Sequence, residues 1–385
     1  MPATVALPYY FHCPLNRTNY LPGLNTLRLW AATVVVLAHC HLNLRLMGIS
    51  WMANALAGKG HLAVELFFVI SGFLLTYLAI MEYRKKATVD VKAFFIRRAL
   101  RILPLYFLSV TLGYISLYLA DRGGVVSEYH EIPFWKGVMC YVFMIPNYVI
   151  SRWTHVVGAH YSLWSIGVEE QFYLLFPFAV LWLFQRKKQW QTVLLLLVVY
   201  FTVWQVLQWE GLEIASVVRK FLGTLEFQFM LFGSLGAFLI THNVFSIPLT
   251  NTVKKLWVKI ALILLFLFLF FTENLMPVFA EQLLAGAVFT LLILSITHHN
   301  EGLTHWEVQP LSYLGSISFG IYIFHTHVSY VLRFIIQRWA GLLAAIQQFP
   351  TLYFIIEMAL TILVAHVSYR YFEDYFLRMK NRYIQ

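Results

Sequence analysis

Two ionisable side chains, Arg28 and His39, lie within one apolar stretch at 24–46. They are eleven residues apart, so in a helix both lie on nearly one face, roughly 16 Å apart along the axis. Ionisable groups are costly to place inside a membrane, and each is therefore a candidate functional group. Histidine titrates near neutral pH and suits general-base or nucleophilic chemistry. The structural alternative is an arginine that extends to the membrane surface and a histidine that bonds a neighbouring helix.

Two later apolar stretches each carry polar residues at spacings of three and four, which places those residues on one face of a helix. The polar residues of the two stripes are Ser162, Ser165, Glu169 and Tyr173, and Ser318, Tyr322, His325 and Ser329. Packing alone does not explain a carboxylate at Glu169, and its expected depth in the membrane is similar to that of His39. The position of His325 is as consistent with a helix contact as with chemistry.

Further polar positions lie at two other helix starts. Glu65 precedes Ser71 and Gly72, and Gly72 permits either a close helix contact or the passage of a ligand. Arg98 and Arg101 share a helix face, and guanidinium groups bind phosphate through two parallel hydrogen bonds. A basic cluster of this kind is also an ordinary topology signal.

Metal and nucleotide sites are not predicted. His298, His299 and His305 lack ligand spacing, and neither the phosphate loop GxxxxGK[ST] nor the nucleophile elbow GxSxG occurs. The remaining ionisable residues in apolar stretches that belong to neither stripe are Glu226, Glu281, Glu357 and His366.

Membrane helices must position these residues. Of the 385 residues, 60% are hydrophobic and only 12% are charged. Because soluble proteins carry about a quarter charged residues, this composition excludes a soluble globular protein. Continuous apolar runs exclude an outer-membrane barrel, whose strands alternate apolar and polar residues. We therefore predict an all-α polytopic membrane protein.

Windows of about 20 apolar residues predict about ten transmembrane helices. They are 24–46, 61–80, 102–120, 162–184, 190–209, 221–240, 257–272, 278–296, 311–336 and 352–372. Cytoplasmic loops concentrate Lys and Arg, and the clusters at 84–101 and 186–188 must then be separated by an even number of crossings. We therefore predict that the shorter apolar segment 134–149 is re-entrant or interfacial.

The same charge rule predicts a multi-pass protein of the cytoplasmic (inner) membrane with both termini in the cytoplasm. We expect a cytoplasmic N-terminal segment at 1–20 without a removable signal peptide, a membrane domain at 21–376 and a cytoplasmic tail at 377–385. The net charge of +10 lies largely in loops, so membrane lipids are expected partners and nucleic acid is not. The oligomeric state stays open.

Five motifs, taken together and in order, resemble the acyltransferase-3 family of integral membrane acyltransferases. They are LPGL at 21–24 followed by Arg28 and His39, HLAVELFFVISGF at 61–73, RALRILP at 98–104, LWSIGVEEQFY at 163–173 and LGSISFGIYIFH at 314–325. The resemblance implies ten crossings and no bound cofactor. It implies acyl-CoA as cytoplasmic donor, with acetyl-CoA favoured, and an extracytoplasmic sugar, polysaccharide or lipid-linked glycan as acceptor. Departures are mild, such as Glu65 where Asp is common.

The resemblance also implies roles for individual residues. His39 is predicted to be the general base, or a nucleophile that carries the acyl group, and Glu169 is predicted to orient its imidazole. Arg28, Arg98 and Arg101 are predicted to bind the donor. The other pocket candidates are Glu65, Ser71, Ser165, Tyr173, Tyr322 and His325.

Two other functions remain compatible with the polar stripes. A non-catalytic transporter of a lipid-linked sugar or small solute is one, because polar stripes also line transport paths. Paired interrupted helices, which mark many transporters, are not evident in the sequence. Acylation of a lipid or small metabolite is the other, and it stays within the same enzyme class.

Overall fold

In the computed structural model, helices are the only regular secondary structure among the residues that it describes. These are 21, 23–51, 58–122, 133–153, 160–186, 188–208, 216–241, 251–253, 255–272, 276–297 and 309–381. The predicted N-terminal segment 1–20, His298, His299 and His305 lie outside the described residues. The prediction of an all-α polytopic membrane fold is confirmed.

Nine helical stretches within the described residues are long and apolar enough to cross a membrane. The helices that carry the site are α1 (Leu24–Leu46), α3 (Gly60–Lys86), α4 (Val91–Arg122), α7 (Leu163–Phe184), α10 (Phe227–Thr241) and α15 (Ser318–Arg338). The others are α8 (Gln189–Gln208), α9 (Ser216–Gly223), α12 (Leu256–Phe271), α13 (Val278–Thr297), α14 (Gln309–Ser316), α16 (Ala340–Gln348), α17 (Pro350–Ser368), the π-helical turn η4 (Tyr369–Glu373) and α18 (Asp374–Asn381). The remaining predicted span, 257–272, corresponds to the shorter apolar helix α12, of 16 residues.

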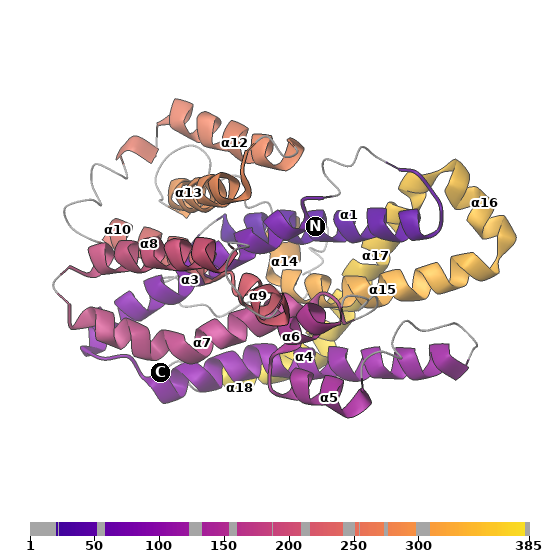
Figure 1. Ribbon diagram of the computed structural model, residues 1–385, viewed down its shortest axis with the longest axis horizontal. Helices are drawn as coiled ribbons and strands as arrows, with labels where there is room; N and C mark the ends of the chain where they lie inside the picture. Colours follow the sequence, from indigo (N-terminus) through magenta and orange to yellow (C-terminus); the bar gives the residue numbers. More distant parts are fainter. Residues whose placement is uncertain are drawn as a thin grey trace, which may run out of the picture.

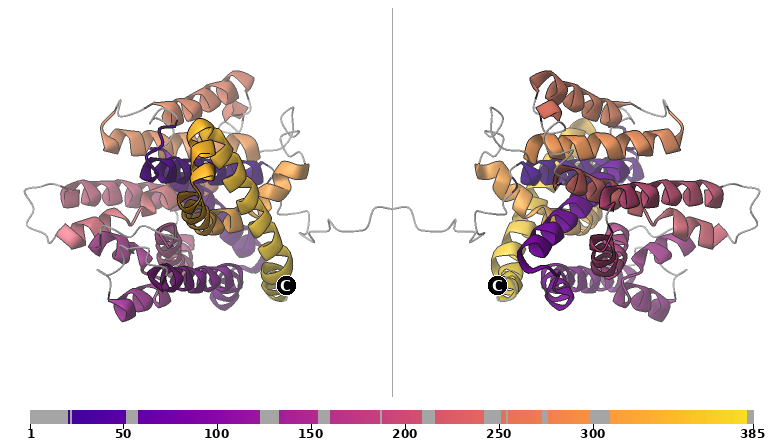
Figure 2. Two further views of the ribbon diagram at one scale, coloured as in Figure 1. Left: turned by 90° about the vertical axis from the view of Figure 1, so that its right-hand side faces the viewer. Right: turned by 90° about the vertical axis from the view of Figure 1, so that its left-hand side faces the viewer.

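The helices form a bundle with α1 and α3 in its interior. Figures 1 and 2 show α12 at one edge and α4 at the opposite edge, with α1 and α3 between them. The most extensive helix contact among the described residues joins α3 to α10. A Cβ atom on Gly72 would lie 2.0 Å from the Met230 carbonyl oxygen, and one on Gly233 would lie 2.1 Å from the Val69 carbonyl oxygen. Gly72 thus serves a close helix contact, as small residues do between membrane helices.

The segment predicted to dip into the membrane is broken into two short helices. They are α5 (Phe134–Val142), of nine residues, and α6 (Pro146–Arg152), of seven, and Met144 between them has φ 57°. A membrane-spanning helix needs about 20 residues, so neither crosses alone. Helix α6 packs against α7, where a Cβ on Gly167 would lie 2.5 Å from Pro146.

The two basic clusters lie at one end of the bundle. Tyr83 at the end of α3 stacks on Phe184 at the end of α7, with ring centroids 4.3 Å apart. The Arg84 guanidinium donates a hydrogen bond of 2.5 Å to the Thr241 carbonyl at the end of α10. Arg186 lies two residues after the end of α7, so it shares a side of the bundle with Arg84, as an even number of crossings between the two clusters requires.

Candidate active site

Two cavities of different chemistry meet inside the bundle. The larger, of about 900 Å³, is lined by His39 and is called here the histidine cavity. The smaller, of about 120 Å³, is the arginine cavity. Its polar lining consists of Arg28, Arg98, Arg101, Ser71, Ser165, Glu169, Tyr173, Ser318 and Tyr322. Val64 and Tyr322 line both cavities, so these two side chains stand at the boundary.

The arginine cavity is a cationic site. Helix α1 supplies Arg28 and α4 supplies Arg98 and Arg101, whereas Glu169 on α7 is the only carboxylate in the lining. The Ser71 hydroxyl donates a hydrogen bond of 2.6 Å to a Glu169 oxygen. With three guanidinium groups against one carboxylate, the cavity favours an anionic ligand, and guanidinium forks match phosphate oxygens.

The cation at Arg98 is held against aromatic faces. Its guanidinium carbon lies 5.5 Å from the ring centroid of Tyr173 and 5.9 Å from that of Phe94. Arg97 on the neighbouring face pairs instead with Glu82 at 3.4 Å. Of these two neighbouring arginines, Arg98 therefore lines the arginine cavity, and Arg97 forms an ion pair that is not part of its lining.

His39 has a defined hydrogen-bonding state. Its Nδ1 lies 3.0 Å from the Val35 carbonyl oxygen, one helical turn earlier. Because a carbonyl oxygen only accepts, Nδ1 carries the proton and the neutral imidazole keeps a lone pair on Nε2. The ring contacts those of Tyr161 and His325, with centroids 5.9 Å and 4.8 Å away. A neutral Nε2 in an open cavity can accept a proton or attack a carbonyl carbon.

His325 lies behind His39 and is fully buried. Its Nδ1 donates a hydrogen bond of 2.5 Å to the Tyr322 carbonyl oxygen, so its Nε2 is also unprotonated in the neutral ring. That Nε2 is buried without a hydrogen-bond partner among the described residues. His325, which belongs to the second predicted polar stripe, therefore lies next to His39.

Tyr322 and Ser165 form the wall between the cavities. Their hydroxyl groups share a hydrogen bond of 2.6 Å, and the Tyr322 hydroxyl donates to the Ser162 carbonyl at 3.0 Å. Both residues are buried, and the Tyr322 ring packs edge-on against Phe67. Residues of the two predicted stripes therefore meet where the cavities join.

The predicted pairing of Glu169 with His39 is not formed. No hydrogen bond joins the two side chains in the described part of the chain, and they line different cavities. The sequence spacing predicted the depth of Glu169 in the membrane. It did not predict which neighbouring helices the Glu169 side chain would face. Glu65 likewise lies in the histidine cavity, whereas Ser71, one turn and a half further on, lies in the arginine cavity.

Several residues of the histidine cavity were not predicted as site residues, among them Tyr161, His61 and Glu226. Tyr161 precedes α7, His61 lies at the start of α3, and Glu226 immediately precedes α10. His61 and Glu65 have the i, i+4 spacing of one helix face, which is a signal present in the sequence. Glu226 is 165 residues from His61 and has no local pattern that links it to the site.

Comparisons with known proteins give one consistent result. The family model of an acyltransferase domain, acyltransferase-3, matches residues 21–370. O-acetyltransferase OatA of Staphylococcus aureus strain NCTC 8325 / PS 47 is 26% identical over 373 residues, which are 92% of this chain and 57% of that relative. OatA of strain COL gives the same values, so the chain spans little more than half of each relative. No solved structure matches the chain.

Proposed function

The chain belongs to the acyltransferase-3 family, and we propose that it moves an acyl group, with acetyl favoured, from cytoplasmic acyl-CoA to a hydroxyl of an extracytoplasmic glycan. One observation carries the proposal: a cationic cavity and a histidine-lined cavity meet at Tyr322. A cationic cavity suits an anionic donor, and a wide cavity suits a bulky acceptor. The OatA relatives are themselves named O-acetyltransferases.

The donor is assigned to the arginine cavity. Arg98 and Arg101 continue the basic cluster at the start of α4, which the positive-inside rule puts in the cytoplasm, where CoA is found. On this basis both termini are cytoplasmic and the membrane is the cytoplasmic one. The cavity volume of about 120 Å³ is below that of a ligand pocket, so it holds only part of a CoA molecule.

The acceptor is assigned to the histidine cavity, where His39 performs the chemistry. The acceptor oxygen attacks the thioester carbonyl carbon, a C–O bond forms and the C–S bond breaks. His39 Nε2 takes the hydroxyl proton and returns it to the CoA thiolate. For the thioester to meet the acceptor, the Ser165–Tyr322 hydrogen bond that separates the cavities must open.

A nucleophilic role for His39 remains a second route within the same reaction. Here Nε2 attacks the thioester carbonyl, an N–C bond forms, CoA thiolate leaves and the acyl-imidazole then transfers its acyl group to the acceptor hydroxyl. Both routes need a free Nε2, which the Val35 hydrogen bond favours. Trapping of an acyl-protein in the absence of acceptor would distinguish the second route from the first.

The test is transfer of labelled acetyl from acetyl-CoA by the purified chain in detergent, with envelope glycan as acceptor. His39→Ala should lower the rate roughly a hundredfold or more, because no base or nucleophile remains. His366→Ala is the matched control, since His366 bonds Tyr313 and lines neither cavity. Equal rates in wild type and His39→Ala would contradict the role of His39. Movement of a lipid-linked sugar without acetyl transfer would contradict the proposed function itself.

A further inference from the structure

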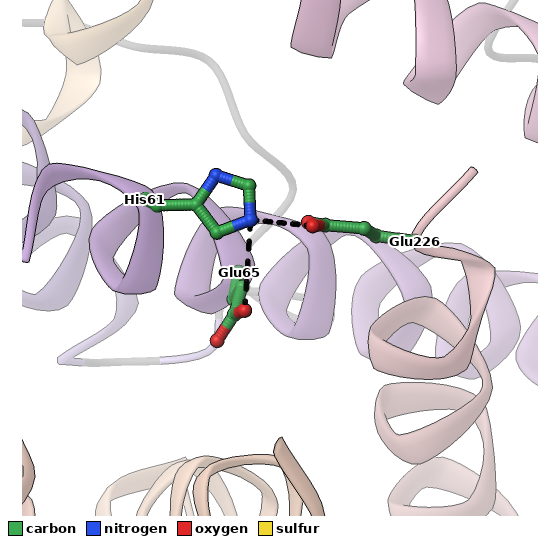
Figure 3. Close-up of side chains that lie close together, drawn as sticks. All are labelled: His61, Glu65 and Glu226. Carbon is green, nitrogen blue, oxygen red and sulfur yellow. Dashed lines mark hydrogen bonds and ion pairs between the residues drawn. The ribbon is translucent and has the colours of Figure 1, made fainter. Parts of the chain in front are cut away.

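The histidine cavity contains a second group of chemically active side chains that acyl transfer does not use. Figure 3 shows His61 and Glu65 on α3 facing Glu226, which precedes α10. His61 Nε2 lies 2.5 Å from a Glu226 oxygen and 3.8 Å from a Glu65 oxygen. One ligand atom from each of the three residues lies within 4.8 Å of the others.

Carboxylates outnumber the cationic groups around this cluster. Glu65 and Glu226 are each only 4% exposed. The charged groups nearest to them are His61 and the ion pair of Lys59 with Glu281, whose charged atoms are 2.5 Å apart. With His61 neutral, three carboxylates face one ammonium group, which leaves two negative charges unbalanced. Buried charges are stable only when they are paired or coordinate a metal, and this excess equals the charge of one divalent cation.

Two buried oxygen atoms give an independent indication of a ligand. Glu226 Oε2 and Gln282 Oε1 have no hydrogen-bond partner among the described residues, and both side chains line the histidine cavity. Gln282 is 8% exposed and Glu226 is 4% exposed, so water outside the protein does not readily satisfy them. Buried polar atoms are nearly always satisfied, and these two oxygen atoms are electron-pair donors on residues that line the cavity.

We propose that His61, Glu65 and Glu226 bind a divalent transition-metal ion, with Zn²⁺ as the best match. One imidazole and two carboxylates form a ligand set that Zn²⁺ accepts, and three protein ligands leave a fourth position open. Ligand atoms of a tetrahedral Zn²⁺ site are about 3.3 Å apart, so the three side chains need to shift by about an ångström. The His61 ring is stacked on Trp164 at 5.4 Å and 11°, which fixes its plane.

The open coordination position would face the cavity that contains His39. A hydroxyl or phosphate oxygen of a bound acceptor is a suitable fourth ligand there, because Zn²⁺ polarises such oxygens. The His61 side chain is 53% exposed, so the ion has access from the cavity. This site goes beyond the proposed acyl transfer, and ion binding can be measured without any acyl donor.

The experiment uses the purified full chain in detergent, stripped with a chelator and then titrated with Zn²⁺ alone. We expect one tightly held ion per chain and a higher midpoint of thermal unfolding with Zn²⁺ than without it. Glu65→Gln and Glu226→Gln should each weaken Zn²⁺ binding by tenfold or more and abolish that shift. Glu357→Gln is the control, since Glu357 is a buried carboxyl that bonds Ser329 away from both cavities.

Two results would overturn the proposal: no Zn²⁺ retained by the wild-type chain, or equal affinity in wild type and Glu226→Gln. If His61 is instead an imidazolium that pairs with both carboxylates, Zn²⁺ will leave the midpoint of thermal unfolding unchanged. Should the glutamine variants fail to fold, His61→Asn gives the same comparison at a half-exposed position. A chain that binds Zn²⁺ but transfers no acetyl group would leave this inference intact and remove only the proposed function.

Discussion

His39 and His325 have the same local arrangement. Each directs its Nδ1–H to a carbonyl oxygen of its own helix, that of Val35 at 3.0 Å and that of Tyr322 at 2.5 Å. Each neutral ring therefore keeps its lone pair on Nε2. The backbone of α1 sets the tautomer of His39, a task that a carboxylate performs in the hydrolase triad. This explains how His39 can be a base or nucleophile although Glu169 does not contact it.

The arginines of the smaller cavity permit a test that separates phosphate binding from a topology signal. Arg101→Lys keeps the charge but loses the planar fork, so the affinity for acyl-CoA should fall by about 1–2 kcal/mol while topology is unchanged. The measurement is an acyl-CoA titration of the purified variant. Arg45→Lys is the control, because Arg45 lines the histidine cavity instead. Equal donor affinities in the two variants would contradict the assignment of the donor to the arginine cavity.

At the scale of elements, local periodicity predicts helix faces but not the partners of those faces. The spacing of Ser165, Glu169 and Tyr173 predicts a shared face, and all three line the arginine cavity. The hydrogen bond from Ser71 to Glu169 joins residues 98 apart. Such pairings depend on which helices pack together, and no residue near Glu169 encodes that choice. For the same reason the sequence did not predict that Glu226 lies at the site.

The contact between α3 and α10 predicts the effect of one methyl group. In Gly72→Ala the new Cβ would lie 2.0 Å from the Met230 carbonyl oxygen, which is backbone and cannot move aside without shifting α10. Overpacking of this kind should destabilise the protein by about 1–3 kcal/mol, which exceeds the helix-propensity gain of alanine. Thermal unfolding in detergent measures it. Gly341→Ala is the control, because nothing lies within 4 Å of its added Cβ. Equal midpoints in both variants would contradict the close contact.

His160, just before α7 and outside the membrane-spanning segments, predicts a pH dependence of stability. It is 2% exposed, and its Nε2–H donates a 3.0 Å hydrogen bond to the Val110 carbonyl. Burial lowers its pKa to about 4 from an ordinary value of 6.5. The unfolded chain thus binds a proton that the folded chain does not, so stability is full above pH 6.5 and falls as pH drops towards 4, by up to about 1.4 kcal/mol per pH unit.

Thermal unfolding of wild type and His160→Gln between pH 4.5 and 7.5 checks this expectation. The variant should lose part of the acid-dependent decrease in stability, because glutamine can donate a hydrogen bond but does not titrate in this range. An identical pH slope in both proteins would show that other groups cause the decrease.

At the scale of the whole molecule, composition and charge together determine more of the architecture than any motif. The low charged fraction of 12% predicts membrane helices, and the two basic clusters predict that 134–149 does not cross. The structure agrees, since α5 and α6 are short and the clusters share one end of the bundle. Helix α12, with 16 residues, is shorter than the roughly 20 that a span needs.

Side-specific labelling tests this arrangement in the membrane. In a chain whose three native cysteines are replaced by serine, single cysteines at Asp90, Lys188, Trp135 and Trp339 occupy exposed positions. Asp90→Cys and Lys188→Cys should react only from the cytoplasmic side with an impermeant maleimide, because both lie beside the basic clusters. Trp135→Cys on α5 and Trp339→Cys after α15 should react only from the other side. Labelling of Lys188→Cys from the side of Trp135→Cys would mean an odd number of crossings between 90 and 188. The prediction that 134–149 does not cross the membrane would then be wrong.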